Sequence, residues 1–183
     1  MATDKQAQLA DQLGRMLPGL RAFIRLRTGP EIRAQESCSD LVQSVCRELI
    51  EEWSVLDFPN DAALRSWLFT TALHKVRNRA RHMHQQRRDV GREVRGSQGA
   101  ELAAGYADLG TPSAAAMTVE QIEQLEAAFD RLPEDYREVI TLARLAGLPL
   151  ADVGERMGGR SQGAITMLLG RALSALGREL AAY

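Results

Sequence analysis

Basic side chains are concentrated in one short stretch near the middle of the chain. Residues 75–95 contain eight Lys or Arg and two Asp or Glu, and all three histidines lie between residues 74 and 84. The chain of 183 residues as a whole carries a formal net charge of −1. A surface that binds nucleic-acid phosphates benefits from such a concentration of cations, whereas a helix that only faces solvent has no need of it. The stretch is therefore predicted to bind a polyanion.

The periodicity of this stretch predicts a helix that begins near Asp61 and has two different faces. At 100° per residue, the apolar side chains Leu68, Ala72, Val76 and Met83 share one side. The other side carries the first candidate DNA contacts, which are His74, Arg77, Asn78, Arg81 and Arg88, with Gln85 among them. Like charges repel on a helix surface, so their clustering favours a phosphate partner. The alternative is an arginine-rich helix that only faces solvent.

A second candidate DNA-binding segment lies near the end of the chain. Residues 150–157 predict a short helix, a glycine-containing turn follows, and Ser161 is suited to cap a second helix. Gly154 has no side chain at the point where the two helices must approach closely. This order of elements is typical of a helix-turn-helix. An ordinary helical hairpin is the alternative.

A third polar surface is predicted on the helix in "ESCSDLVQSVCRELIEEW", where Ser37 and Asp40 have the spacing of a capping box. Leu41, Val42, Val45, Leu49 and Trp53 recur at helical spacing and form its buried stripe. A polar stripe runs beside it, formed by Asp40, Gln43, Ser44, Arg47 and Glu51. This stripe either contacts a partner or faces solvent.

The remaining residues favour neither a metal site nor enzymatic chemistry. Cys38 and Cys46 are separated by about 12 Å if they share one helix, too far for a disulfide. The histidines lack metal-ligand spacing, and the sequence has no phosphate-cradling loop and no catalytic triad signature. We therefore expect no metal, no cofactor and no catalytic activity. A nucleic-acid enzyme is the weakest of the alternatives.

The composition predicts an all-α protein made of two small helical domains. Ala, Leu, Arg and Glu dominate, and residues 90–118 are rich in Gly, Ala and Ser. We expect domains at residues 1–89 and 119–183, joined by a flexible linker at 90–118. The first helix is predicted to be interrupted or to start near Pro18 and to end at Gly29–Pro30. No apolar run suits a membrane span or a signal peptide, so a cytoplasmic protein is expected.

Acidic residues are also segregated along the chain. The net charge is −5 over residues 31–60 and −7 over residues 101–138. A random surface would mix the two signs, so this zoning indicates a second contact surface that faces something basic.

Three blocks of the sequence together resemble the extracytoplasmic-function sigma factors of bacterial RNA polymerase. They are "SDLVQSVCREL", "LRSWLFTTALHKVRN" and "LPEDYREVITLARLAGLPLADVGERMGGRSQGAITMLLGRAL", and their order and spacing agree with that family. The resemblance covers most of the chain outside residues 90–118. It implies a helical sigma domain two, a flexible linker and a helix-turn-helix sigma domain four.

The resemblance also implies roles for individual residues. The polar stripe, with Asp40, Gln43, Ser44, Arg47 and Glu48, would dock on the clamp helices of the polymerase core. The helix from Trp67 to Arg88 would bind the minus-ten element, with Lys75, Arg77 and Arg81 on phosphates. The second helix of the helix-turn-helix would enter the major groove at the minus-thirty-five element. Its outward residues are Ser161, Gln162, Gly163 and Thr166, and Arg160 and Arg171 would hold phosphates.

The sequence therefore predicts a sigma factor that directs the polymerase core to promoter DNA without catalysing a reaction. The rival hypothesis is a stand-alone helix-turn-helix regulator whose N-terminal helices bind a partner. Such a regulator would explain the helix-turn-helix but not the basic face of residues 74–88. The sequence leaves open whether an anti-sigma protein binds this chain.

Overall fold

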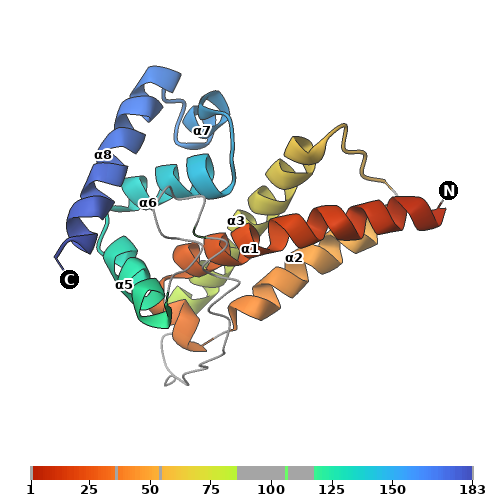
Figure 1. The fold of residues 1–183 in the computed structure, drawn as a ribbon, viewed down its shortest axis with the longest axis horizontal. Helices are drawn as coiled ribbons and strands as arrows, with labels where there is room; N and C mark the ends of the chain where they lie inside the picture. Colours follow the sequence, from red (N-terminus) through yellow and green to blue (C-terminus); the bar gives the residue numbers. More distant parts are fainter. Residues whose placement is uncertain (1, 36, 54, 86–105, 107–117, 183) are drawn as a thin grey trace.

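The computed structural model describes residues 2–35, 37–53, 55–85, 106 and 118–182, and within these ranges the secondary structure is helical, with no strand (Figure 1). This confirms the predicted all-α class. The elements follow in the order α1 (Ala2–Gln35), α2 (Cys38–Glu52), α3 (Asp61–Gln85), α5 (Val119–Asp130), α6 (Glu134–Ile140), the π-helix η3 (Thr141–Leu145), α7 (Leu150–Arg156) and α8 (Gln162–Leu180).

The long helix α1 differs from the sequence prediction at its proline. It continues through Pro18, where an interruption or a helix start was expected, and leaves helical geometry only at Gly29, whose φ is 67° and ψ 168°. Met16 and Leu20 are buried on either side of Pro18, and this packing outweighs the low helix propensity of proline. The break at Gly29 agrees with the prediction, since glycine adopts positive φ without strain.

Helix α2 packs through the predicted stripe, because Leu41, Val42, Val45 and Leu49 are buried. Its N-terminus is capped differently from the prediction. The hydroxyl of Ser37 accepts a hydrogen bond from the backbone N–H of Ser39 at 3.2 Å, one residue before Asp40. A reciprocal capping box is present instead at the start of α5, between Thr118 and Gln121.

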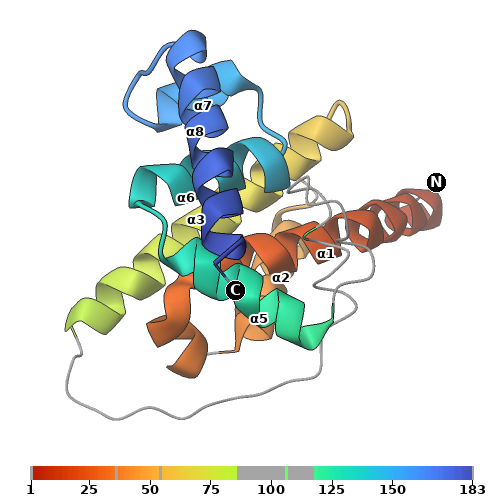
Figure 2. The same cartoon turned by 60° about the vertical axis from the view of Figure 1, so that its left-hand side comes forward.

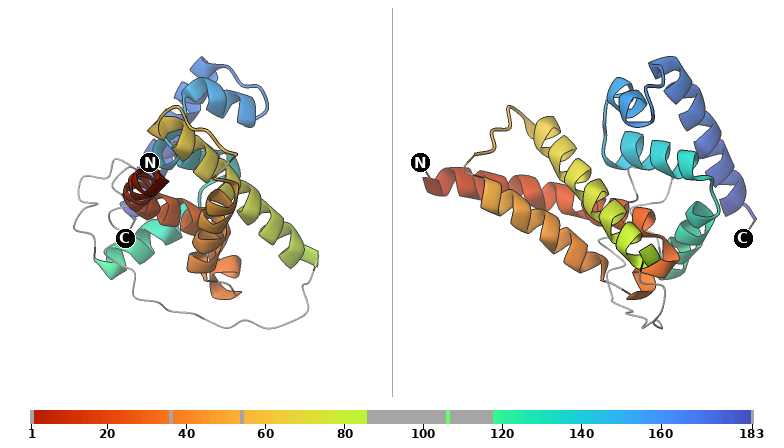
Figure 3. Two further views of the ribbon diagram at one scale, coloured as in Figure 1. Left: turned by 90° about the vertical axis from the view of Figure 1, so that its right-hand side faces the viewer. Right: turned by 180° about the vertical axis from the view of Figure 1, so that it is seen from behind.

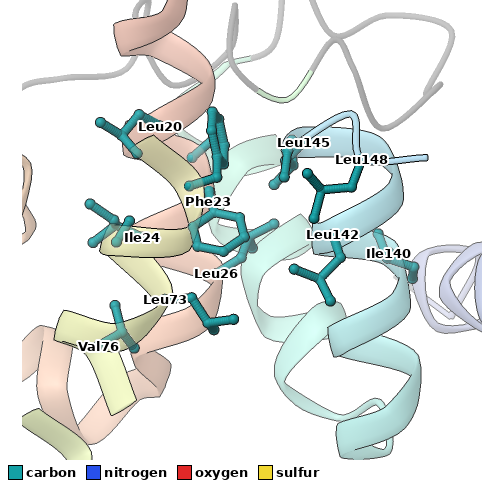
Figure 4. Close-up of a cluster of buried hydrophobic side chains, with 14 of the residues drawn as sticks. Leu20, Phe23, Ile24, Leu26, Leu73, Val76, Ile140, Leu142, Leu145 and Leu148 are labelled. Carbon is teal, nitrogen blue, oxygen red and sulfur yellow. The ribbon is translucent and has the colours of Figure 1, made fainter. Parts of the chain in front are cut away.

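Helices α1, α2 and α3 form a bundle, and the C-terminal elements α5 and η3 pack directly on α1 (Figures 1 and 2). Figure 4 shows the contact in detail. Leu20, Phe23 and Leu26 of α1, with Leu73 of α3, lie opposite Leu142, Leu145 and Leu148, which come from η3 and the residues after it. All of these side chains are buried. The buried core is therefore continuous between the two predicted domains.

The N-terminal half of α1 points away from α7 and α8, which lie at the opposite end of the molecule (Figure 3). The predicted linker, residues 90–118, lies outside the described residues apart from Tyr106 and Thr118. Its flexibility and the domain boundaries at 89 and 119 therefore remain predictions. No helix in the described ranges is apolar over a length that would span a lipid bilayer.

Candidate nucleic-acid interface

Helix α3 has the two faces that its periodicity predicted. Leu68, Ala72 and Val76 are buried against the bundle. The side chains of His74, Arg77, Asn78 and Arg81 are exposed on the other face. Arg88, another candidate DNA contact, lies outside the described residues.

Within this basic face, Arg81 is held by a neighbour on its own helix. Its Nη2 donates a hydrogen bond to Oδ1 of Asn78 at 2.7 Å. A side-chain amide in this position orients the guanidinium without neutralising it. The charge of Arg81 therefore stays available to a phosphate.

Two other cations of the face are paired with carboxylates of the same chain. Lys75 is half-buried, and its Nζ lies 2.6 Å from Glu48 of α2. Arg77 is exposed, and its Nη2 lies 2.5 Å from Glu138 of α6. The ion pair and the partial burial of Lys75 therefore make its ammonium group less accessible to a phosphate than that of an exposed, unpaired lysine. Both pairs must exchange partners before these two residues can hold a phosphate.

The predicted polar stripe of α2 is present as a mostly exposed surface. Asp40, Gln43 and Arg47 are exposed, and Ser44 and Glu48 are half-buried. Asp40 also lies in the first turn of α2, where a negative charge interacts favourably with the helix dipole.

The helix-turn-helix is formed by α7 and α8, as predicted. Gly158 and Gly159 make the turn with φ of 88° and 75°, a conformation that other residues rarely adopt. Ser161 then caps α8, because its hydroxyl accepts a hydrogen bond from the N–H of Ala164 at 3.3 Å. A Cβ at Gly154 would lie 2.1 Å from the carbonyl oxygen of Arg160, so α7 meets the turn before α8 where only glycine fits.

The start of α8 presents the residues that were predicted to face DNA. Ser161, Gln162, Gly163 and Thr166 are all exposed. The hydroxyl of Thr166 donates to the backbone oxygen of Gln162 at 2.9 Å. The first turn of α8 contains no acidic residue. The positive end of the helix dipole is therefore unopposed there and suits a phosphate.

The two arginines assigned to phosphates in this part of the chain have different surroundings. Arg160 is exposed but lies 2.6 Å from Asp135 at the start of α6. Arg171 is exposed on α8 and borders a shallow surface depression together with Tyr136, Met167 and Arg178. The negative charge of Asp135 partly offsets Arg160, whereas Arg171 has no ion pair among the residues that are described.

Sequence reasoning missed a set of arginines in the first three helices that contact the C-terminal helices. Arg25 donates a hydrogen bond to Glu126, Arg33 to Asp130, and Arg27 lies 3.0 Å from Glu134. Arg65 donates to the backbone oxygens of Leu145 and Ala146 at 2.5 and 3.0 Å. A signal was present, because acids recur at every fourth position at 126, 130, 134 and 138.

Burial changes the acid–base properties of this contact. Burial lowers the pKa of Arg27, whose side chain is 8% exposed. Burial also opposes the charge of Arg25, but the hydrogen bond and the charge of Glu126 outweigh it and raise the pKa of Arg25. Burial raises the pKa of the thiols of Cys38 and Cys46, which are unpaired as predicted.

An exposed basic helix and a helix-turn-helix in one all-α chain define a DNA-binding protein. Residues 122–176 match the family model for sigma-70, region 4. The chain is 30% identical over 168 residues to the ECF RNA polymerase sigma factor EcfG of Rhodopseudomonas palustris (strain TIE-1). That alignment covers 92% of this chain and 82% of the relative. No solved structure matches the chain.

The chain therefore belongs to the extracytoplasmic-function sigma factors, and it is an RNA polymerase sigma factor. This confirms the family and the function predicted from the three sequence blocks. Membership implies the polymerase core and promoter DNA as partners.

Proposed function

We propose that three surfaces of this sigma factor divide the work of promoter recognition. The polar stripe of α2 binds the polymerase core. The exposed basic face of α3 holds the minus-ten element, and the start of α8 enters the major groove of the minus-thirty-five element. The domains that carry these surfaces are residues 1–89 and 119–183, with residues 90–118 as the linker.

One observation supports this division most directly. The α3 helix keeps His74, Arg77 and Arg81 exposed on one side, while its other side is buried in the bundle. A stand-alone regulator that binds only through its helix-turn-helix has no use for this second cationic surface. A sigma factor uses it to hold one strand of the promoter while the duplex opens.

The proposed mechanism uses binding free energy and involves no covalent step. Contacts between basic side chains and phosphates position the DNA. These side chains are Lys75, Arg77, Arg81, Arg88, Arg160 and Arg171. Contacts of Gln162 and Thr166 with base edges select the sequence, since each well-formed pair contributes about 1–3 kcal/mol of discrimination. Unstacked bases of the non-template strand, bound beside α3, offset the cost of opening the duplex.

The linker lets two weak sites act together. Once one domain is bound, the other searches at an effective concentration that the linker length sets. On this proposal the protein works where the polymerase works, in the cytoplasm, and has no catalytic activity of its own. The polar stripe of α2 provides a partly acidic surface that suits a basic helix of the core. Its residues are Asp40, Gln43, Ser44, Arg47 and Glu48.

Run-off transcription with purified core polymerase on a pool of genomic promoter fragments tests this function. We expect transcripts that require both the core and this chain, and their start sites identify the recognised elements. Tight binding of duplex promoter DNA by the chain alone, with no transcripts when the core is added, would instead support the stand-alone regulator.

A further inference from the structure

Met167 is a large apolar residue that the fold leaves exposed. It lies on α8 and is 61% exposed. Two other large apolar residues of the described ranges, Ile50 and Val55, are as exposed as this, and both belong to the N-terminal part of the chain. A single exposed apolar side chain is common on a protein surface and by itself indicates nothing. The significance of Met167 therefore depends on which face of α8 carries it.

Met167 lies on the face of α8 that points away from the C-terminal core. Ile165 and Ala172 are buried on the inner face. At 100° per residue, Met167 is roughly 140–160° from both of them around the helix axis, and it shares the outer face with Gly163 and Gly170. These three residues are exposed, and α8 runs along the outer edge of the C-terminal helices (Figure 1). In a helix-turn-helix, the outer face of the second helix enters the major groove.

Two glycines flank Met167 on this face. Gly163 lies four residues before it and Gly170 three residues after it, and these are neighbouring positions on a helix surface. A Cβ at either glycine would meet nothing within 4 Å, so packing inside the chain requires neither of them. Glycine destabilises an exposed helix relative to alanine, and one use that compensates is close approach of the backbone to a ligand. The two glycines therefore allow α8 to approach a ligand closely on either side of the Met167 side chain.

The surroundings of Met167 suit nucleic acid better than an apolar protein surface. Met167 borders a shallow depression with Tyr136 and Arg171, and none of the described residues that line this depression is acidic. A basic border of this kind attracts phosphates. The apolar group that B-DNA displays in the major groove is the C5-methyl group of thymine. A long, flexible thioether side chain can adapt to the position of such a methyl group.

We infer that Met167 is a specificity-determining residue, whose side chain packs against the C5-methyl group of a thymine in the minus-thirty-five element. The inference rests on the proposed function, because it requires α8 to lie in the major groove of that element. Met167 and Gln162 are about 7.5 Å apart along the helix axis. Neighbouring base pairs are ~3.4 Å apart, so Met167 contacts a different base pair from Gln162.

Replacing thymidine by deoxyuridine tests this contact, because the replacement removes only the C5-methyl group. Each thymine on either strand of the minus-thirty-five element is replaced in turn, in a promoter that the run-off experiment identifies. Binding of the full chain with core polymerase to each duplex is measured by fluorescence anisotropy. We expect one replacement to weaken wild-type binding about fourfold, which is the effect of one buried methyl group. The Met167→Ala variant should bind the original duplex and this modified duplex equally.

Two further variants control for indirect effects. Met167→Leu keeps an apolar side chain of similar volume and should retain the preference for thymine over uracil. Ser174→Ala changes an exposed residue further along α8 and should lose as much affinity on the modified duplex as the wild type does. Because Met167 is exposed, Met167→Ala removes neither core packing nor a phosphate contact. It should therefore leave the melting temperature and the salt dependence of binding unchanged.

Two results overturn the Met167 contact: no deoxyuridine replacement weakens wild-type binding, or Met167→Ala shows the same loss as the wild type. Run-off transcription from the unmodified promoter is measured in parallel. If transcripts require both the core and this chain, either of these results overturns the Met167 contact alone. If no promoter gives such transcripts, the proposed function fails, and the Met167 contact fails with it.

Discussion

The ammonium group of Lys75 on α3 lies 2.6 Å from the carboxylate of Glu48 on α2. These two residues were assigned to different partners, Lys75 to promoter DNA and Glu48 to the polymerase core. The ion pair places the edges of the two proposed surfaces side by side. Binding of the core on α2 can therefore change the charge that Lys75 offers to DNA on α3.

Removing Glu48 tests whether this pair serves binding rather than folding. The side chains of Lys75 and Glu48 are 26% and 37% exposed, and exposed pairs contribute about 0–1 kcal/mol to stability. We expect Glu48→Ala to change the free energy of unfolding by less than ~1 kcal/mol and to weaken binding of core polymerase, measured by chemical denaturation and by fluorescence anisotropy. Glu52→Ala, at the exposed end of the same helix, is the control. A stability loss of several kcal/mol would indicate a structural role.

The basic face of α3 predicts a change in salt dependence. Each phosphate contact contributes about 0.9 to the slope of log K against log salt concentration. We expect Arg77→Ala combined with Arg81→Ala to weaken open-complex formation and to reduce this slope by about two units. Open-complex formation is measured from 50 to 200 mM KCl. Arg178→Ala, exposed in the last turn of α8, should leave the slope unchanged. An unaltered slope in the double variant would show that the face does not hold phosphates.

Gln162 at the start of α8 is expected to affect sequence preference rather than general affinity. Its side chain is exposed, and an amide that forms paired hydrogen bonds to a base contributes about 1–3 kcal/mol of discrimination. Gln162→Ala should change the preferred base at one position of the minus-thirty-five element, with little change in the salt slope. Transcription from a randomised promoter library measures this. Ser174→Ala, on the same helix, is the control. An equal loss on every promoter would contradict the prediction.

The glycine at which α7 meets the turn before α8 predicts a large effect from a single methyl group. A Cβ at Gly154 would overlap the carbonyl oxygen of Arg160, and overpacking of this kind costs about 1–3 kcal/mol or more. Gly154→Ala should therefore lower thermal stability and weaken minus-thirty-five binding. Gly170→Ala, where a Cβ meets nothing within 4 Å, should instead stabilise the chain by about 0.5–1 kcal/mol. Similar melting temperatures for the two variants would contradict the close crossing.

Tyr106 predicts a loss of stability at high pH. Burial and the charge of Glu126 raise the pKa of its phenol well above the usual 10.0, although Arg25 and Arg33 act in the opposite direction. Because the folded state favours the neutral phenol, its contribution is fully present below pH 10 and is lost as the pH rises through the raised pKa. We expect Tyr106→Phe to cost about 1 kcal/mol at pH 8 and progressively less above pH 10. Thermal melts of both proteins between pH 8 and 11 measure the difference. A constant difference over this range would exclude ionisation of Tyr106.

The helices and the helix-turn-helix could be predicted from the sequence because local patterns determine them. The buried stripe of α2, the N-cap at Ser161 and the small residue at Gly154 all act over a few residues. The exposed faces of α3 and α8 followed from the same periodicity. Pro18 and Ser37 show the limit of such patterns. Helix α1 continues through Pro18, and the hydroxyl of Ser37 accepts from the N–H of Ser39 without forming a capping box with Asp40.

The contact between the two predicted domains could not be derived in the same way. Arg25 and Glu126 are about one hundred residues apart in the sequence, and no local rule relates them. The acidic zone at residues 101–138 indicated a basic surface, and the structure places four of its carboxylates on arginines of this chain itself. The segregation of acidic residues along the sequence predicted a basic contact surface. It did not indicate whether that surface belongs to this chain or to a partner.

Glu126 also determines how the contact can come apart. Its carboxylate depends on Arg25 and Tyr106 for both of its hydrogen bonds and is almost out of reach of water. A small displacement of α5 would remove these bonds before solvent could replace them, leaving a bare charge in an apolar setting. Partly separated arrangements are therefore high in free energy. Separation of α5 from α1 on unfolding should therefore be an all-or-none event.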